Sequence, residues 1–228
     1  MTRAEHIPAG FTPAKQIAGT AVLATVVFSA AAWLSRGAPA LAWLCLPAFW
    51  VFANFFEWTV HRFPMHRPMF PRVMYRNHTL IHHGAFDEKT MAMDNPRELS
   101  LIMMPWYTIV MLLVAASPVG ILAALIGGLP VVGIFYIGAL SYFLFYETVH
   151  ALYHVAPEKL VRLGIRGDGL FARMRAHHTH HHIPRRMAHV NFNVTVPLAD
   201  IVLGTRERSD AAPAAEPARA SRARSGTT

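Results

Sequence analysis

Long apolar runs alternate with short polar segments along this chain of 228 residues. The first run covers residues 16–35 without a charge, and the second, residues 39–60, carries only Glu57, close to its end. A third run begins at Leu99, and a fourth ends near Glu147. Because a membrane-spanning helix needs about 20 mostly apolar residues, the pattern predicts an all-α membrane protein with four transmembrane helices.

Two turn signals lie between the third and fourth runs, at Ser117–Pro118 and at the Gly-Gly-Leu-Pro of residues 127–130. Either turn leaves two crossings, so both positions stay open. The runs predict a membrane domain over residues 16–208, preceded by a cytoplasmic segment, residues 1–15. Residues 209–228 are rich in Ala, Pro, Ser and Arg without apolar periodicity, which predicts a disordered basic tail.

The composition narrows the class of protein. Hydrophobic residues make up 54% of the chain and charged residues 15%, whereas a soluble domain carries about 25% charged residues. An ordinary soluble domain and a disordered chain are therefore excluded. The single cysteine, Cys45, lies inside an apolar run, which excludes a disulfide framework and a cysteine-based zinc site. The first run is longer than the roughly 7–15 residues of a signal-peptide core, so we expect it to be retained.

The net charge of +8 is less informative than where the charges lie. With four spans, 20 of the 21 Lys and Arg residues fall on one side of the membrane, and Arg36 alone falls on the other. The positive-inside rule assigns the basic side to the cytoplasm. We therefore expect a multi-pass membrane protein with both termini in the cytoplasm, and no nucleic-acid partner.

Histidine is the unusual residue of this chain, with 14 copies. Thirteen of them fall in four groups at predicted cytoplasmic helix ends, in the strings HRFPMH, HTLIHH, HALYH and HHTHHHIPRRMAH. His6 stands apart, and His189 closes the last string; we interpret both as ordinary interfacial side chains. Four groups on one side of one membrane predict a shared metal site in a histidine-rich helical cap.

The spacing within the groups supports metal binding, because residues three or four apart share one face of a helix. This spacing predicts three sets of converging rings: His150 with His154, His78 with His82, and His178 with His181 and His182. His61 and His66 are five apart with Pro64 between them, so we expect the helix to loosen there.

The number of histidines indicates two metal ions. About ten imidazoles exceed the four to six ligands of one ion, and neutral imidazole suits Zn, Cu, Fe and Ni. Metal-bound histidines usually donate their second ring N–H to a carboxylate or a carbonyl. Glu57 and Glu147 lie close to histidines in the sequence and are the candidate acceptors.

The four histidine strings, together with the closing stretch NFNVTVPLADIVLGT, resemble the fatty acid hydroxylase superfamily, which includes sterol desaturases, fatty acid 2-hydroxylases and carotenoid hydroxylases. The similarity covers residues 52–205. It implies a non-haem di-iron centre that uses O2 to oxidise a C–H bond, with no catalytic side chain beyond the metal centre. The ligands that it implies are His61, His66, His78, His82, His83, His150, His154, His178, His181 and His182.

The last histidine string fits the family pattern in two frames, because His177, His180 and His181 also have the required spacing. We expect the later frame to bind metal, which leaves His177 and His180 as candidate partners of the ligands. The closing stretch has Asn193 where the family usually has Gly and Ala199 where it usually has Trp. These departures weaken an assignment to one subfamily.

The resemblance implies a membrane lipid hydroxylase that acts on a fatty acyl chain. Carotenoid hydroxylation and sterol or acyl desaturation on the same scaffold stay open, because the ligand set does not separate them. The metal implied is iron, which zinc can replace during purification. The string HPGG of a fused cytochrome domain is absent, so the electrons are expected from a separate ferredoxin- or cytochrome-type donor with its reductase.

Two readings from other classes are less well supported. A divalent-metal transporter would carry ionisable residues within its spans, and the spans here are nearly bare of them. A membrane zinc hydrolase would carry H-E-x-x-H, and that string is absent from the sequence.

Overall fold

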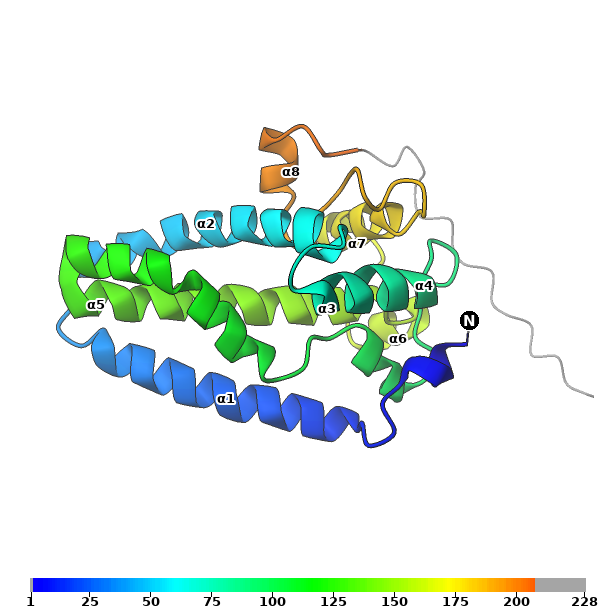
Figure 1. The fold of residues 1–228 in the computed structure, drawn as a ribbon, viewed down its shortest axis with the longest axis horizontal. Helices are drawn as coiled ribbons and strands as arrows, with labels where there is room; N and C mark the ends of the chain where they lie inside the picture. Colours follow the sequence, from blue (N-terminus) through cyan, green and yellow to red (C-terminus); the bar gives the residue numbers. More distant parts are fainter. Residues whose placement is uncertain (1, 208–228) are drawn as a thin grey trace, which may run out of the picture.

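The computed structural model describes residues 2–207, and the predicted tail of residues 209–228 lies outside this range. Every regular element of the described residues is helical. Three elements are long and apolar enough to cross a membrane: Pro13–Leu34, Ala40–Met65 and Thr108–Tyr153. They lie side by side along the long axis of the molecule (Figure 1).

The first span is the helix α1 (Pro13–Leu34), which begins where the sequence supplies a helix start. Pro13 occupies the first turn, where its missing N–H costs nothing. The Thr12 side chain accepts a hydrogen bond from the backbone N–H of Lys15. The second span combines the 3₁₀ segment η2 (Ala40–Leu44), the helix α2 (Cys45–Val60) and the π-helical segment η3 (His61–Met65).

The helix α5 (Thr108–Tyr153) reverses direction within its length. Its 46 residues correspond to about 69 Å of helix, more than twice the roughly 30 Å of a hydrocarbon core. At Gly128 the backbone takes φ 71°, a conformation open to glycine, and the two arms of α5 run back alongside each other (Figure 1). The turn therefore lies at the second of the two predicted signals, while Ser117–Pro118 remains inside the first arm.

The predicted start of the third span at Leu99 is wrong. Leu99 lies in the 3₁₀ segment η5 (Pro96–Leu101), and α5 begins only at Thr108. Side chains satisfy the intervening non-helical backbone: Glu147 accepts from the Met104 N–H at 3.0 Å, and the Gln16 amide donates to the Met104 carbonyl at 2.7 Å. These contacts replace the helical hydrogen bonds that the backbone lacks there, so the apolar run can be non-helical at this point.

Small residues allow the long helices to approach closely. A Cβ on Gly133 would lie 2.5 Å from the Ala31 carbonyl oxygen, and one on Gly138 would lie 3.3 Å from the Phe49 Cβ. Close backbone contact of this kind is a main source of stability between helices in a membrane. It holds both α1 and α2 against the second arm of α5.

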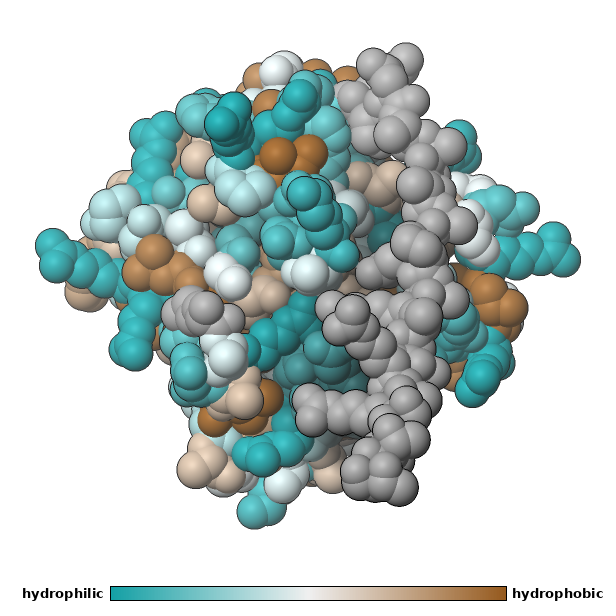
Figure 2. All heavy atoms as spheres, turned by 90° about the vertical axis from the view of Figure 1, so that its right-hand side faces the viewer, coloured by the Kyte–Doolittle hydropathy of each residue, from teal (hydrophilic) through white to brown (hydrophobic). Residues whose placement is uncertain are grey.

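Most of the remaining helices gather at one end of the spans, on the right of Figure 1, and the last of them, α8 (Leu198–Val202), lies alongside α2. Hydrophilic residues predominate on this end face (Figure 2). We call this part the cap. It consists of η1 (Arg3–His6), α3 (Arg72–Tyr75), η4 (Arg76–His82), α4 (His83–Ala85), η5, α6 (Pro157–Arg162), α7 (Gly169–His181) and α8 (Leu198–Val202).

Candidate metal centre

Ten histidines come together in two groups of five, and in each group the ligand-type ring nitrogens lie within 4.8 Å of one another. All ten side chains are buried. The first group is His61, His66, His78, His83 and His181, and the second group is His82, His150, His154, His178 and His182. These are the ten histidines implied as ligands by the sequence resemblance.

Two π-helical segments build the first group. In η3, the wider π turn brings His66 back beside His61, with ring centroids 5.0 Å apart. In η4, the same spacing of five brings His83 beside His78, at 4.8 Å. Each turn of a π-helix closes between residues i and i+5, so a five-residue spacing suits it. The loosening of the helix expected between His61 and His66 is confirmed.

The expected pairing of His78 with His82, and of His178 with His181, is wrong, whereas the expected pairing of His178 with His182 and of His150 with His154 is confirmed. His78 joins His83 in the first group, and His82 belongs to the second. Likewise His181 belongs to the first group, while His178 and His182 belong to the second. Consecutive residues point about 100° apart around a helix, so neighbouring histidines in η4 and at the end of α7 face different groups.

Backbone carbonyls orient the rings by accepting hydrogen bonds from Nδ1. The acceptors are Phe192 for His61, Leu101 for His82 at 2.9 Å, Met91 for His154 at 2.8 Å, Val190 for His181 at 2.9 Å, and Phe86 for His182 at 2.6 Å. A neutral ring that donates through Nδ1 carries a bare lone pair on Nε2. Five rings are therefore held with Nε2 as the atom available to a metal ion.

Thr79 orients His66 in the same way. Its hydroxyl donates to the Met65 carbonyl at 2.6 Å, so at 3.1 Å from His66 Nδ1 it can act only as the acceptor. Nε2 of His66 is then bare, and it lies 3.0 Å from the equally bare Nε2 of His181. Two lone pairs cannot form a hydrogen bond, so this approach fits a cation held between the rings.

A proton is not that cation. Burial, followed by the neighbouring histidines, lowers the pKa of His66 to about 2. Burial likewise lowers the pKa values of His78, His83 and His181 well below 6.5. The rings are neutral at physiological pH, which is the form that binds metal. The first group therefore fits a metal ion.

The second group fits a metal ion by the same criteria. Nε2 of His182 lies 3.1 Å from Nε2 of His178, and Nε2 of His82, His150 and His154 has no hydrogen-bond partner among the described residues. Buried polar atoms rarely lack partners. Burial lowers the pKa of His82 to about 4. An imidazole-only donor set of this kind suits zinc, copper, iron or nickel.

The two acidic candidates make other contacts. Glu57 accepts hydrogen bonds from the Tyr142 hydroxyl, from the Thr195 hydroxyl at 2.6 Å, and from the backbone N–H groups of Val194 and Thr195. Glu147 accepts from the Met104 N–H. Among the described residues, no hydrogen bond joins either carboxylate to a histidine, because the ring N–H groups turn to backbone carbonyls.

His177 and His180 lie outside both groups, as does His189. His177 Nε2 donates to Asp200 at 3.1 Å, and His180 lies 3.4 Å from Glu207. The geometry thus brings together the histidines of the later frame of the last string.

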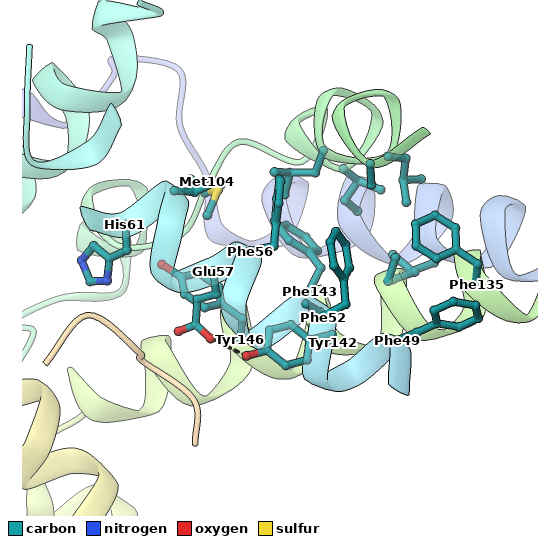
Figure 3. Close-up of a pocket in the computed structure, with 18 of the residues that line it drawn as sticks. Phe49, Phe52, Phe56, Glu57, His61, Met104, Phe135, Tyr142, Phe143 and Tyr146 are labelled. Atoms are coloured by element: carbon teal, nitrogen blue, oxygen red, sulfur yellow. Dashed lines mark hydrogen bonds between the residues drawn. The ribbon is translucent and has the colours of Figure 1, made fainter. Parts of the chain in front are cut away.

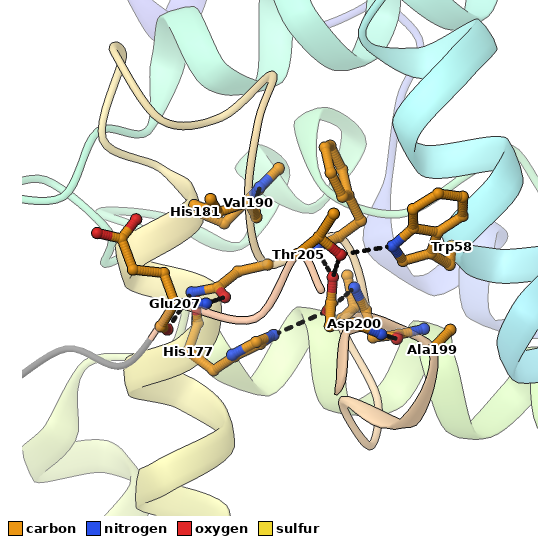
Figure 4. Close-up of polar contacts among 12 residues, drawn as sticks. Trp58, His177, His181, Val190, Ala199, Asp200, Thr205 and Glu207 are labelled. Carbon is orange, nitrogen blue, oxygen red and sulfur yellow. Dashed lines mark hydrogen bonds and ion pairs between the residues drawn. The ribbon is translucent and has the colours of Figure 1, made fainter. Parts of the chain in front are cut away.

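Asp200 is an important residue that sequence reasoning did not single out, although it lies in the closing stretch (Figure 4). It is fully buried, and it accepts from the N–H groups of Phe192 at 3.0 Å and Asn193 at 2.8 Å. The Thr205 hydroxyl donates to it at 2.6 Å. Burial is the largest influence and opposes its ionisation, but the hydrogen bonds from His177, Thr205 and Asn193 and the attraction to His177 together lower its pKa. Asp200 thereby fixes the loop whose carbonyls orient two rings of the first group.

Arg3 has the corresponding position beside the second group, and no signal in the sequence indicated it. Its guanidinium donates to the carbonyls of Ala85 at 2.9 Å and Ala92 at 2.8 Å, and also to that of Thr90. It pairs with the buried Glu98 at 2.8 Å. These contacts fix the loop whose carbonyls orient His154 and His182.

An apolar groove leads away from the first group, between α2 and the two arms of α5 (Figure 3). It begins at His61 and Met65 and continues to Phe49 and Phe135. Glu57 also lines it, with both carboxylate oxygens bonded to protein donors.

Comparison with known proteins gives one match. Residues 46–205 match the family model described as fatty acid hydroxylase. This is more than half of the chain, and it includes all ten histidines of the two groups. Neither the curated proteins nor the solved structures give a match.

Proposed function

The chain belongs to the fatty acid hydroxylase family, and on that premise we propose that it is a membrane-bound, O2-dependent lipid hydroxylase with two iron ions. Its substrate is a fatty acyl chain, free or within a lipid. Family membership implies an oxidoreductase, and the long apolar helices fit a membrane enzyme.

One kind of observation carries the metal assignment: bare Nε2 atoms face each other at 3.0 Å in the first group, and buried Nε2 atoms of His82, His150 and His154 have no hydrogen-bond partner among the described residues in the second. Each group of five histidines would hold one ion. When bound, the iron ions would supply the activation of O2 and the oxidation of an unactivated C–H bond. Imidazole alone does not select iron over zinc, so iron rests on the family.

The protein's own part in the reaction is to bind, orient and exclude water. Thr79 and the backbone carbonyls fix which ring nitrogen faces inward. Burial of all ten rings keeps bulk water from the site. The groove brings a hydrocarbon chain to His61, and no side chain need act as a general base.

We further propose that the two arms of α5 are separate spans, which makes four crossings. The reversal at Gly128 and the length of each arm support this. The positive-inside rule then favours a cytoplasmic cap and cytoplasmic termini. In that position the metal site is accessible to a separate cytoplasmic electron donor of the ferredoxin or cytochrome type, with its reductase.

The test compares whole lipid extracts of cells that express the wild-type chain, His181→Ala or His189→Ala. His181 belongs to the first group, whereas His189 is exposed and lies outside both groups. We expect lipids heavier by one oxygen atom in the wild type and in His189→Ala, and none in His181→Ala. Products lighter by two hydrogens would indicate a desaturase. If neither product forms with a donor present while cellular metal content changes, the oxygenase assignment fails.

A further inference from the structure

We propose that the groove binds one unbranched acyl chain and that the ring pair of Phe49 and Phe135 closes its far end, so that this pair sets the chain length of the substrate. The proposal rests on the proposed function and adds a specificity-determining pair to it. Neither phenylalanine belongs to a histidine string or to the closing stretch.

The shape of the groove is that of a slot along the helices. Its lining on α2 recurs every three or four residues, at Phe49, Phe52, Ala53, Phe56, Glu57 and Val60. The first arm of α5 contributes residues with the same spacing, from Ile109 to Ala116, and the second arm contributes residues from Phe135 to Tyr146. Such spacing marks one face of a helix, so three helix faces enclose a space parallel to the spans.

The chemistry of the slot favours hydrocarbon. Two of its polar side chains already have protein partners: Glu57 accepts from Tyr142 and Thr195, and the Tyr142 hydroxyl accepts from the Asn54 amide at 3.0 Å. The other lining groups along its length are aliphatic or aromatic. A polar ligand would lose hydrogen bonds to water and gain few here, which costs free energy.

The length of the slot matches one lipid chain. Phe49 and His61 are twelve residues apart on one nearly continuous helix, which corresponds to about 18 Å. One leaflet is half of a hydrocarbon core of roughly 30 Å. A chain from the adjacent leaflet therefore fits with its polar end toward the cap and its methyl end at Phe49.

The far end is closed by an aromatic pair with a defined position. The rings of Phe49 and Phe135 meet edge to face, with centroids 5.2 Å apart. Glycines back both of them: a Cβ on Gly138 would lie 3.3 Å from the Phe49 Cβ, and one on Gly120 would lie 3.4 Å from the Phe135 ring. Phe135 is fully buried, whereas Phe49 is half-buried (Figure 3). The end wall thus joins α2 to both arms of α5.

The experiment feeds a ladder of saturated fatty acids, from lauric to arachidic acid, to cells that express the wild type, Phe49→Ala or Phe70→Ala. Phe70→Ala is the matched control, because its ring is exposed in the cap. One methylene that fits or clashes in an apolar pocket changes discrimination roughly tenfold or more. We therefore expect the ratio of longer to shorter oxidised products to rise at least about tenfold in Phe49→Ala and to stay unchanged in Phe70→Ala.

A product profile of Phe49→Ala equal to that of the wild type would overturn the proposal while the oxygenase function stands. If the wild type oxidises no chain, the oxygenase function fails, and binding tests the slot by itself. In that assay the same ladder displaces a fluorescent polyene fatty acid from the purified protein in detergent. Displacement that favours longer chains in Phe49→Ala supports the slot, and displacement independent of chain length in both proteins refutes it.

Discussion

The two histidine groups have the same donor atoms but are fixed by different parts of the chain. The rings of His61 and His181 in the first group are oriented by a C-terminal loop, and the carboxylate of Asp200 gathers the N–H groups of that loop. The rings of His154 and His182 in the second group are oriented by an internal loop, and the guanidinium of Arg3 gathers its carbonyls.

Side chains of opposite charge hold the two loops that orient the histidine rings. The carboxylate of Asp200 accepts hydrogen bonds from loop N–H groups, so the carbonyls of that loop remain free to accept from the histidine rings. The guanidinium of Arg3 donates to loop carbonyls other than those that accept from the rings. Because the two supports come from opposite ends of the described chain, damage to one is expected to spare the other group. One prediction concerns both groups together, and two others test this independence.

Acid is expected to have the largest effect on stability, because protonation acts on the histidines of both groups at once. Burial lowers the pKa of His82 from 6.5 to about 4, and it lowers the pKa values of His181 and His182 further. Below pH 6.5 these histidines bind protons in the unfolded chain but not in the folded, metal-free protein. The free energy of unfolding should have its highest value above about pH 6.5. It should fall by about 1.4 kcal/mol per pH unit for each such histidine as the pH drops toward 4. Thermal unfolding of the metal-free protein in detergent measures this, and a flat profile between about pH 7 and 5 would contradict it.

Asp200→Asn is expected to weaken the first group alone. The substitution keeps the size of the side chain but replaces a carboxylate that accepts four hydrogen bonds. Loss of a partner that orients metal ligands costs roughly 10- to 100-fold in metal affinity. Metal titration should show this fall in the binding step that His66→Ala also removes.

Glu207→Gln is the control for Asp200→Asn, because Glu207 follows the same loop but pairs with Arg186 and His180. It should leave both binding steps unchanged. An equal loss from both steps in Asp200→Asn would show that the two groups are not independently supported.

Arg3→Met is expected to weaken the second group alone, by about tenfold, the lower end of the range for such partners. The effect should be smaller because the Arg3 side chain is 15% exposed, so water can reach some of the carbonyls that it leaves. The affected titration step should be the one that His150→Ala removes. Arg36→Met, at an exposed site outside the cap, serves as the control, and a fall in the first-group step would refute the assignment.

The sequence predicted which histidines lie close together better than how they divide into two groups. Helical spacing and a shared side of the membrane brought out the four histidine strings, and the resemblance selected the later frame of the last one. The division into groups depends on π turns at His61–Met65 and Arg76–His82, and a spacing rule for α-helices does not contain them. The five-residue intervals before His66 and His83 were the available signal.

The supports of the two groups were harder to predict for another reason. Arg3 acts on residues 82 or more positions away in the chain, so only tertiary packing reveals its role. The start of α5 was missed because an apolar run reports burial in lipid and not helicity. The backbone around Met104 and Trp106 is satisfied by Gln16 and Glu147, which are distant in sequence.

Neighbouring histidines that belong to opposite groups also limit the distance between the two groups. His82 and His83 belong to different groups, as do His181 and His182, and the Cα atoms of consecutive residues are about 3.8 Å apart. Two covalent links therefore join the two groups, one at the end of η4 and one at the end of α7. Ligand exchange or loosening of a loop can change the occupancy of either group, while these two covalent links limit how far the groups can move apart.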